Sequence, residues 1–262
     1  MKQIYKYPRT HHIQGSRLQP GDEELDNIPF AEIKQRYGVV EEKIDGANAA
    51  ISFTADGQIQ LQSRGHYLTG GAGEKHFNLF KQWANTHVAS FWEVLGKRYI
   101  LYGEWLYAKH TVFYDALPHY FFEFDVLDLE KQLFLSTAKR KQLLAGLPLV
   151  SVPVLMKGEL QSYKQLISLL GKSHYQTSEH LQNFENICLQ KGLDIERCLQ
   201  QTDQSSVMEG LYIKIESTDT VVERYKYVRS SFLTTIERSD GHWLNRPIIP
   251  NQLRDGVDLF AA

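Results

Sequence analysis

The stretch VVEEKIDGANAAISF, residues 39–53, decides how the chain is expected to fold. It places an apolar run on each side of a polar turn, which is the pattern of two strands joined by an exposed loop that starts at Lys43. The turn pair Asp56-Gly57 follows, and apolar residues then alternate with glutamines over 59–63, as in a hairpin with one buried face. The sequence therefore predicts neighbouring strands with Lys43 at the first connection.

Length and composition fit a soluble protein with a good core. The chain has 262 residues, of which 42% are hydrophobic, and a net charge of −2. This balance gives no overall polyanion-binding signature, so nucleic acid would need a local basic surface. We find no signal peptide and no run of about 18 apolar residues, which predicts no membrane contact. Cys188 and Cys198 are too few for a disulfide framework and favour a reducing cytoplasm.

The middle of the chain mixes helices and strands. An amphipathic helix is expected over residues 75–96, with a core-facing stripe made of Phe77, Phe80, Trp83, Ala84, Val88, Phe91, Trp92 and Leu95. Aromatic-rich strands follow at 99–107 and 119–128, and Ser136 is placed to cap a helix at 137–145.

Residues 158–203 carry leucines at helical intervals and predict three short helices. Strands return at 207–216 and 220–229, separated by a turn. We therefore expect one α+β domain over residues 1–262. It would contain an embedded helical insert at 136–205 and end in a short C-terminal tail at 230–262.

Two other features carry no site. The glycine-rich segment 65–76 lacks the Gly-Lys-Ser/Thr ending of a phosphate loop and is interpreted as a flexible loop. The ten histidines show no spacing typical of a metal-binding helix, and none is assigned a catalytic role.

The chemistry is indicated by several short motifs in a fixed order. KIDG at 43–46 is by itself an ordinary surface turn. It is followed by SRG at 63–65, YGEW at 102–105, EFDVLD at 123–128, EGLYIK at 209–214 and RYKYVR at 224–229. In this order the segments resemble the ATP-dependent RNA ligases that seal nicks in double-stranded RNA, within the covalent lysyl nucleotidyltransferase superfamily. The resemblance covers residues 38–229.

The resemblance implies a nucleotidyltransferase (adenylation) domain of antiparallel sheets flanked by helices. Lys43 would take AMP from ATP and pass it to an RNA 5′-phosphate, which a 3′-hydroxyl then attacks. The residues after Arg229 are too few for the C-terminal OB barrel of many relatives, so no such barrel is expected. A separate RNA end-healing kinase or phosphatase is the implied protein partner.

Lys43 must lose a proton before it can attack phosphorus, since a free lysine has a pKa of about 10.4. Arg224 and Lys226, which match the last motif of the family, join Lys43 as expected catalytic residues. Together with a divalent metal they are expected to lower the pKa of Lys43 and to neutralise the α-phosphate.

The resemblance also implies a nucleotide site. Glu104 and Glu209 would hold Mg²⁺ or Mn²⁺ or contact the ribose, as hard oxygen ligands can. Phe124 would stack on adenine, although a core role is an alternative at this position. The ATP-binding set consists of Glu42, Lys43, Asn48, Arg64, Glu104, Phe124, Glu209, Lys214 and Lys226. Weaker phosphate contacts are assigned to Arg17, Lys157, Lys164 and Lys172.

The identity of the nucleic acid depends on one detail of the first motif. Typical DNA ligases carry an arginine two places past the glycine, whereas Gly46 is followed here by Ala47 and Asn48. KIDGAN is similar to the RNA-sealing branch. A DNA ligase, another polynucleotide adenylyltransferase and a non-catalytic RNA-binding module with the same cleft stay open as alternatives.

Overall fold

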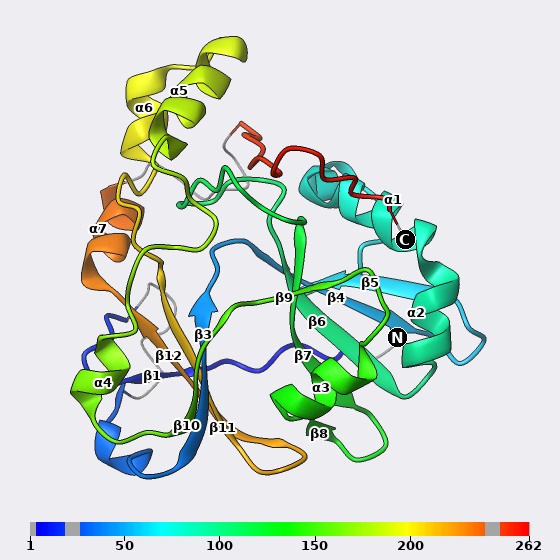
Figure 1. Cartoon of the computed structure of the whole chain (residues 1–262). Helices are drawn as coiled ribbons and strands as arrows, with labels where there is room; N and C mark the ends of the chain where they lie inside the picture. The colour runs from blue at the N-terminus through cyan, green and yellow to red at the C-terminus, as the bar shows by residue number, and fades with distance from the viewer. Residues whose placement is uncertain (1–3, 19–26, 239–246, 262) are drawn as a thin grey trace.

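Two β-sheets form the scaffold of the protein, as the computed structural model shows for residues 4–18, 27–238 and 247–261 (Figure 1). The first sheet has the strand order β10-β3-β11-β12-β1-β2. Its strands are β1 (His11–Ile13), β2 (Asn27–Ile28), β3 (Tyr37–Lys43), β10 (Val154–Glu159), β11 (Gly210–Glu216) and β12 (Val221–Val228). The strands from β10 to β12 are antiparallel, as predicted, while β1 and β2 add parallel pairs at one edge.

The second sheet carries the hairpin predicted after Lys43. Its strand order is β5-β4-β6-β7-β8, with β9 paired in parallel to β7. The strands are β4 (Ala47–Phe53), β5 (Ile59–Ser63), β6 (Tyr99–Trp105), β7 (Phe121–Asp128), β8 (Leu133–Phe134) and β9 (Val150–Ser151). A bulge opposite Tyr102 and Gly103 leaves Phe124 as the extra residue of β7.

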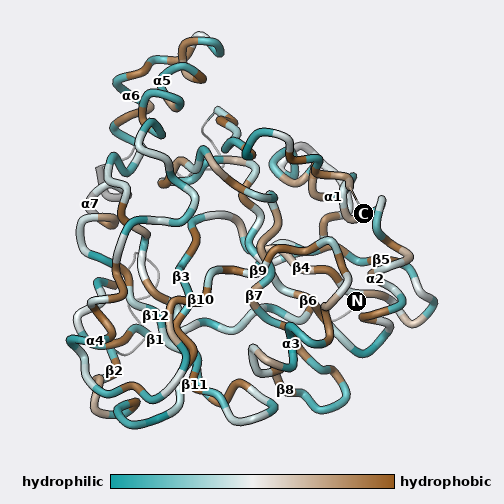
Figure 2. The backbone as a smooth tube through the Cα atoms, viewed as in Figure 1, coloured by the Kyte–Doolittle hydropathy of each residue, from teal (hydrophilic) through white to brown (hydrophobic). Residues whose placement is uncertain are grey.

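Helices cover the outer face of the second sheet. They are the 3₁₀ helix η2 (Ala72–Phe77), α1 (Asn78–Thr86) and α2 (Val88–Leu95). Their buried aromatic side chains pack on the residues of β4, β6 and β7 that point toward the helices. Figure 2 shows hydrophobic segments along β4 and β6. The predicted stripe is therefore core at Phe77, Phe80, Trp83, Ala84, Phe91 and Leu95.

The single helix predicted at 75–96 is wrong in its continuity. The backbone leaves the helical conformation at His87, where φ is −105° and ψ is 16°. Just before this break, Asn85 Nδ2 and Thr86 Oγ1 donate to the carbonyl oxygens of Lys81 and Gln82. Such side-chain bonds compete with the helical ladder and favour its end.

The region predicted as a helical insert is only partly helical. Ser136 caps α3 (Thr137–Leu143) as predicted, and α4 (Tyr163–Ile167), α5 (His180–Gln190) and α6 (Ile195–Gln200) are the three expected short helices. However, residues 136–205 also contain β9 and β10, and β10 pairs with β3. Residues 154–159 thus belong to the first sheet, where they satisfy the outer backbone groups of the strand that carries Lys43.

The C-terminal region packs back on the domain. After β12 it forms α7 (Ser230–Arg238), and residues 247–261 then lie along the connection between β6 and β7. Asn251 is buried and bonds through its side chain to Tyr114 N and Leu106 O. Within the described ranges no barrel follows β12, and no helix there has the length and apolarity needed to cross a bilayer.

Replacing Trp83 by alanine should lower the free energy of unfolding by about 3–5 kcal/mol, because it leaves a cavity where a fully buried indole packs on Phe80, Trp105 and Phe121. Trp92→Ala is the matched control, since Trp92 on α2 is 38% exposed. Urea denaturation measures both variants, and the loss for Trp92→Ala should be clearly smaller. Equal losses would contradict the placement of the core.

Candidate active site

Most of the residues expected to carry the chemistry lie on strands of the two sheets. Lys43 ends β3, and the strand register places it on the same face of the first sheet as Tyr212, Lys214, Arg224 and Lys226. Asn48 and Glu104 are paired across β4 and β6 of the second sheet. The charge of Glu104 acts on Lys43, so these residues of the two sheets lie near one another.

Lys43 is surrounded by carboxylates. Its Nζ lies 2.6 Å from Glu209 Oε1, and the side chains are 23% and 2% exposed. Burial acts to lower the pKa of Lys43, but the charge and hydrogen bond of Glu209, with Glu104 and Asp45 beyond it, raise this pKa above its ordinary value. The protein alone therefore holds Lys43 as an ammonium.

Arg224 and Lys226 are not among the groups that act most strongly on the pKa of Lys43. Arg224 Nε is paired with Asp125 Oδ2 at 3.0 Å, and its guanidinium lies 3.9 Å from the centroid of the Phe134 ring. Lys226 lies closer to the cluster, since its charge opposes the rise that burial causes in the pKa of Glu209. The charges that dominate at Lys43 are negative.

The carboxylates of this cluster are themselves perturbed. Burial raises the pKa of Glu104 to about 8 and that of Glu209 to about 7, against the opposing charge of Lys43. Each carboxylate also raises the pKa of a neighbour, and Glu209 Oε2 is buried without a hydrogen-bond partner. Such a cluster has room for positive charge beyond that of Lys43.

The loop after Lys43 is held by the connection between β6 and β7. Asp45 Oδ2 accepts hydrogen bonds of 2.7 Å from the amides of Thr111 and Val112, and Tyr114 Oη accepts one of 2.9 Å from Asp45 N. Gly46 leaves no space for a side chain, because a Cβ there would lie 2.8 Å from a backbone oxygen of β6. The motif KIDG thus combines Lys43 with two residues that fix the loop after it.

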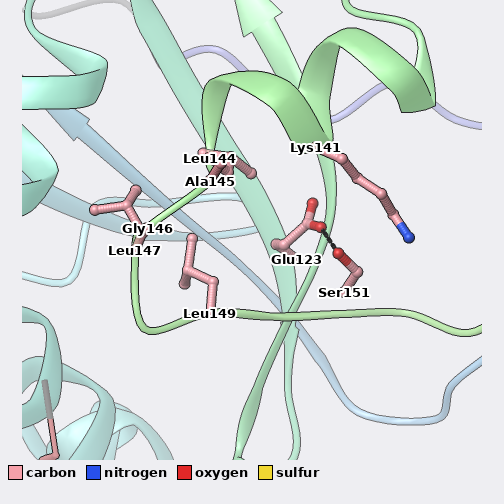
Figure 3. Close-up of a pocket in the computed structure, with 8 residues that line it drawn as sticks. All are labelled: Glu123, Lys141, Leu144, Ala145, Gly146, Leu147, Leu149 and Ser151. Atoms are coloured by element: carbon pink, nitrogen blue, oxygen red, sulfur yellow. Dashed lines mark hydrogen bonds between the residues drawn. The ribbon is translucent and has the colours of Figure 1, made fainter.

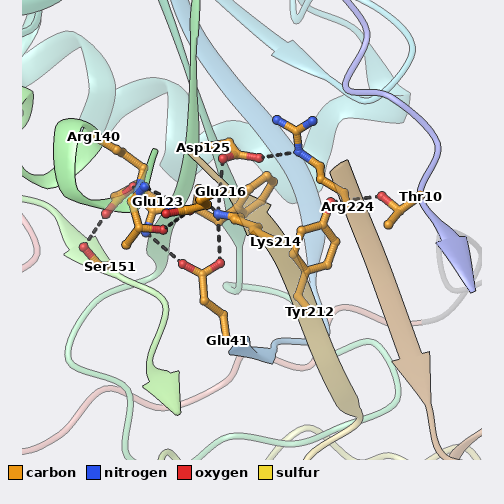
Figure 4. A network of polar contacts seen from close by, with 12 residues as sticks. Thr10, Glu41, Glu123, Asp125, Arg140, Ser151, Tyr212, Lys214, Glu216 and Arg224 are labelled. Atoms are coloured by element: carbon orange, nitrogen blue, oxygen red, sulfur yellow. Dashed lines mark hydrogen bonds and ion pairs between the residues drawn. The ribbon is translucent and has the colours of Figure 1, made fainter. Parts of the chain in front are cut away.

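A chain of buried charges joins the two sheets (Figure 4). Glu41 Oε1 pairs with Arg140 Nη2 at 2.9 Å, and Glu41 Oε2 pairs with Lys214 Nζ at 2.9 Å. Lys214 continues to Asp125 Oδ1 at 3.2 Å, and Arg140 Nε reaches Glu123 Oε2 at 3.0 Å. With Arg224 on Asp125, three carboxylates alternate with three cations.

The N-terminal segment covers one side of this chain. Tyr7 Oη donates to Asp125 Oδ2 at 2.5 Å and lies 2.8 Å from Tyr212 Oη. Its ring meets that of Phe124 edge-on, with centroids 5.1 Å apart. Burial acts to raise the pKa of Asp125, but Lys214 and Arg224 lower it to about 2, so this carboxylate stays ionised.

The family model for RNA ligases matches residues 36–228, which is most of the chain. The protein belongs to the RNA ligase family. No curated protein matches it.

Three solved RNA ligase structures from Naegleria gruberi share the fold of this family member. A lysine-to-methionine variant with AMP and Mn has a TM-score of 0.56 at 18% identity and a lysine-to-alanine variant with ATP and Mn has 0.55 at 18%; each covers 90% of this chain. Another lysine-to-alanine variant, without ligand, has 0.56 at 19% and also covers 90%. This chain spans 59%, 59% and 58% of those proteins, respectively.

The structure of this RNA ligase family member separates the expected site residues into groups. Lys43, Asn48, Glu104, Glu209 and Lys226 lie in or beside the carboxylate cluster. The buried Asn48 Oδ1 has no hydrogen-bond partner.

Three expected nucleotide residues lie elsewhere. Glu42 is on the opposite face of β3, where it accepts hydrogen bonds from Ser173 Oγ at 2.5 Å and pairs with His174 Nδ1 at 2.6 Å. Arg64 is exposed at the end of β5. Lys214 is fully buried in the charge chain, where it also donates to the carbonyl of Phe124. The four weaker candidates, Arg17, Lys157, Lys164 and Lys172, are exposed and lie on separate elements.

Several residues of the site were missed by sequence reasoning. No role was predicted for three residues of the charge chain, Glu41, Glu123 and Arg140. Arg140 lies among lysines in a helix, a pattern that favours a solvated face. Glu123 also borders a pocket of about 270 Å³ beside α3, lined by Lys141, Leu144 and Ser151 among others (Figure 3). This pocket lies at the end of the charge chain and not at Lys43.

Replacing Arg140 by methionine should lower the free energy of unfolding by about 3–5 kcal/mol near neutral pH, because Glu123 stays buried without its ion-pair partner and Glu41 keeps only Lys214. Urea denaturation measures the loss. Lys139→Met, on the same helix but half exposed, is the control and should cost under about 1 kcal/mol. Equal losses in the two variants would contradict the assignment.

Replacing Glu209 by glutamine should lower the pKa of Lys43 relative to the wild type. The amide removes the charge that raises this pKa, whereas burial, which lowers it, remains. A pH titration of the lysine ε-carbon signal by NMR in chelator-treated protein measures the shift. Glu223→Gln, in the distant pair with Arg36, should leave it unchanged. An unchanged or higher pKa in Glu209→Gln would refute the role given to the pair.

Proposed function

We propose that this protein is an ATP-dependent RNA ligase that carries AMP on Lys43. The observation that supports this best is a lysine at the end of β3, 2.6 Å from a buried carboxylate, in a chain of the RNA ligase family. Relatives with the same fold were solved with AMP or ATP and Mn. These relatives support ATP as the substrate.

The proposed reaction has three transfers. Lys43 Nζ attacks the α-phosphorus of ATP, pyrophosphate leaves and a lysyl-AMP forms with loss of a proton. The AMP then passes to the oxygen of an RNA 5′-phosphate and frees Lys43. A 3′-hydroxyl attacks that 5′-phosphorus, AMP leaves and the phosphodiester bond is closed.

Glu209 is the group best placed to handle the proton of Lys43. Its Oε1 already accepts a hydrogen bond from Nζ, and its pKa of about 7 lets it exchange protons near neutral pH. Glu104 lies in the same cluster. The pair Lys43 and Glu209 therefore holds the nucleophile in place until ATP is bound.

The carboxylate cluster also fits a divalent cation, Mg²⁺ or Mn²⁺. Glu104 and Glu209 would hold it, and the unpartnered Glu209 Oε2 is a suitable hard donor. In the described part of the chain no three metal-binding side chains come together, so phosphate oxygens and water would complete the coordination. When bound, the ion supplies positive charge that lowers the pKa of Lys43 and neutralises phosphate.

The other nucleotide contacts follow from position. Phe124, which is half-buried on a bulge, offers its ring to adenine, and Asn48 Oδ1 faces the cluster without a partner. Lys226 and the exposed Arg64 supply charge for phosphates. Lys214 and Arg224 belong to the charge chain beside the cluster, and the side chain of Glu42 points away from it.

RNA with 5′-phosphate and 3′-hydroxyl ends is the proposed substrate, supported by the family and by Ala47 and Asn48 in the first motif. An end-healing kinase or phosphatase would supply such ends, which are the only ones this reaction can join. The reducing cytoplasm fits the free buried thiols of Cys188 and Cys198. A DNA ligase is the alternative substrate assignment.

Protein incubated with Mg²⁺ and ATP labelled on the α-phosphate should retain the label after denaturation, whereas Lys43→Ala should retain none, because it lacks the amine that is proposed to carry AMP. Lys34→Ala is the matched control, an exposed lysine just before the same strand, and should label like the wild type. Gel electrophoresis of the denatured protein gives the result. Label on Lys43→Ala would place the adduct elsewhere.

The labelled protein then decides the acceptor. It is offered nicked RNA duplex, nicked DNA duplex and single strands, each with a 5′-phosphate. Transfer of label to RNA, followed by a longer product strand, is the expected outcome. Transfer only to DNA would replace the substrate assignment, and no label on wild-type protein freed of bound adenylate would remove the catalytic proposal.

A further inference from the structure

Arg229 follows the last strand of the first sheet and is 8% exposed, although no expected nucleotide contact involves it. Its guanidinium binds the segment that ends the insert. Nε donates to Met208 O at 2.8 Å, and Nη2 donates to Ser205 Oγ at 3.0 Å and to Val207 O at 3.1 Å. The same Nη2 is paired with the carboxylate of Asp203. One side chain thus holds four residues of a single segment.

That segment runs directly into Glu209. The amide of Arg229 donates to Glu209 O at 3.2 Å, and its guanidinium binds Met208 O. The two carbonyl oxygens on either side of the Glu209 Cα are therefore both bound by Arg229. Glu209 in turn places its carboxylate 2.6 Å from Lys43 Nζ. The position of the lysine's partner therefore depends on the guanidinium.

A second route connects Arg229 to the loop after Lys43. Asp203, which the guanidinium binds, donates its amide to Thr111 O at 2.8 Å. The amide of Thr111 then donates to Asp45 Oδ2 at 2.7 Å. Arg229 is linked in this way both to the partner of Lys43 and to the loop that follows Lys43.

We infer that Arg229 is a positioning residue for adenylate transfer at Lys43, an inference that rests on the proposed function. It fixes Glu209 and, through Asp203, the loop with Asp45, and it does so without touching substrate. The role requires arginine, because the planar guanidinium presents several donors in a fixed fork, whereas a lysine ammonium is a single point of charge. Lysine at this position keeps the charge and loses the simultaneous bonds.

Arg229→Lys and Asp203→Asn test the inference by single-turnover adenylylation at several ATP concentrations. The rate constant at saturating ATP should fall about tenfold to a hundredfold in Arg229→Lys, because a displaced nucleophile reacts slowly, and by less in Asp203→Asn. The ATP concentration for half-maximal rate should change far less. A purely structural role would instead reduce the fraction of protein that reacts and leave the rate constant of the remainder unchanged.

Arg36→Lys is the matched control, since Arg36 also pairs with a carboxylate on the first sheet, at the far end of β3 from Lys43, and should keep the wild-type rate. Hydrogen exchange of residues 203–209 gives a readout independent of catalysis and should be faster in Arg229→Lys. Unchanged exchange, or wild-type rate constants in both Arg229→Lys and Asp203→Asn, would overturn the inference. Absence of adduct in the wild type would refute only the proposed function, and the exchange result would still decide for or against Arg229.

Discussion

Three carboxylates and three cations alternate between the two sheets, and the arrangement of the sheets depends on how these charges pair. Glu41 belongs to the first sheet and Asp125 to the second, and Lys214 is bound to both. Removing ions from water is costly, so each charge must keep its partners at contact distance. The two sheets therefore cannot slide or separate without leaving a buried charge unpaired. The charge chain therefore specifies one arrangement of the two sheets.

The charge chain and the carboxylate cluster at Lys43 are neighbours with opposite character. In the chain every charge is matched, whereas Lys43 faces Glu104, Glu209 and Asp45 with Lys226 as the nearest additional cation. Glu41 and Lys43 lie on one face of β3, so the matched charge chain lies beside the cluster at Lys43. Because the charges of that chain already balance, the attraction for a further cation is concentrated at the cluster.

Local patterns predicted much of this arrangement, and non-local contacts explain what they missed. The strands around Lys43, the cap at Ser136 and the three insert helices follow from periodicity and turn chemistry, which act over a few residues. β10 was missed because it is a strand only through its pairing with β3. The placement of Arg140 was equally hidden, since the run AKRKQ predicts a solvated basic face until a distant carboxylate is known to lie against it. Glu42 was expected to bind ATP because it stands directly before the KIDG motif. By strand alternation, its side chain points away from that of Lys43.

This alternation connects β3 to different parts of the molecule at adjacent residues. Lys43 faces Glu209, while the carboxylate of Glu42 lies on the opposite face of β3 and binds Ser173 and His174. The segment that contains Ser173 and His174 continues through α5 and α6 to Glu209, the residue before β11 and the partner of Lys43. This segment is therefore attached on both sides of β3, at Glu42 and at Lys43. A displacement of the segment has to move Glu209 or strain β3, so its position and that of the carboxylate beside Lys43 cannot vary independently.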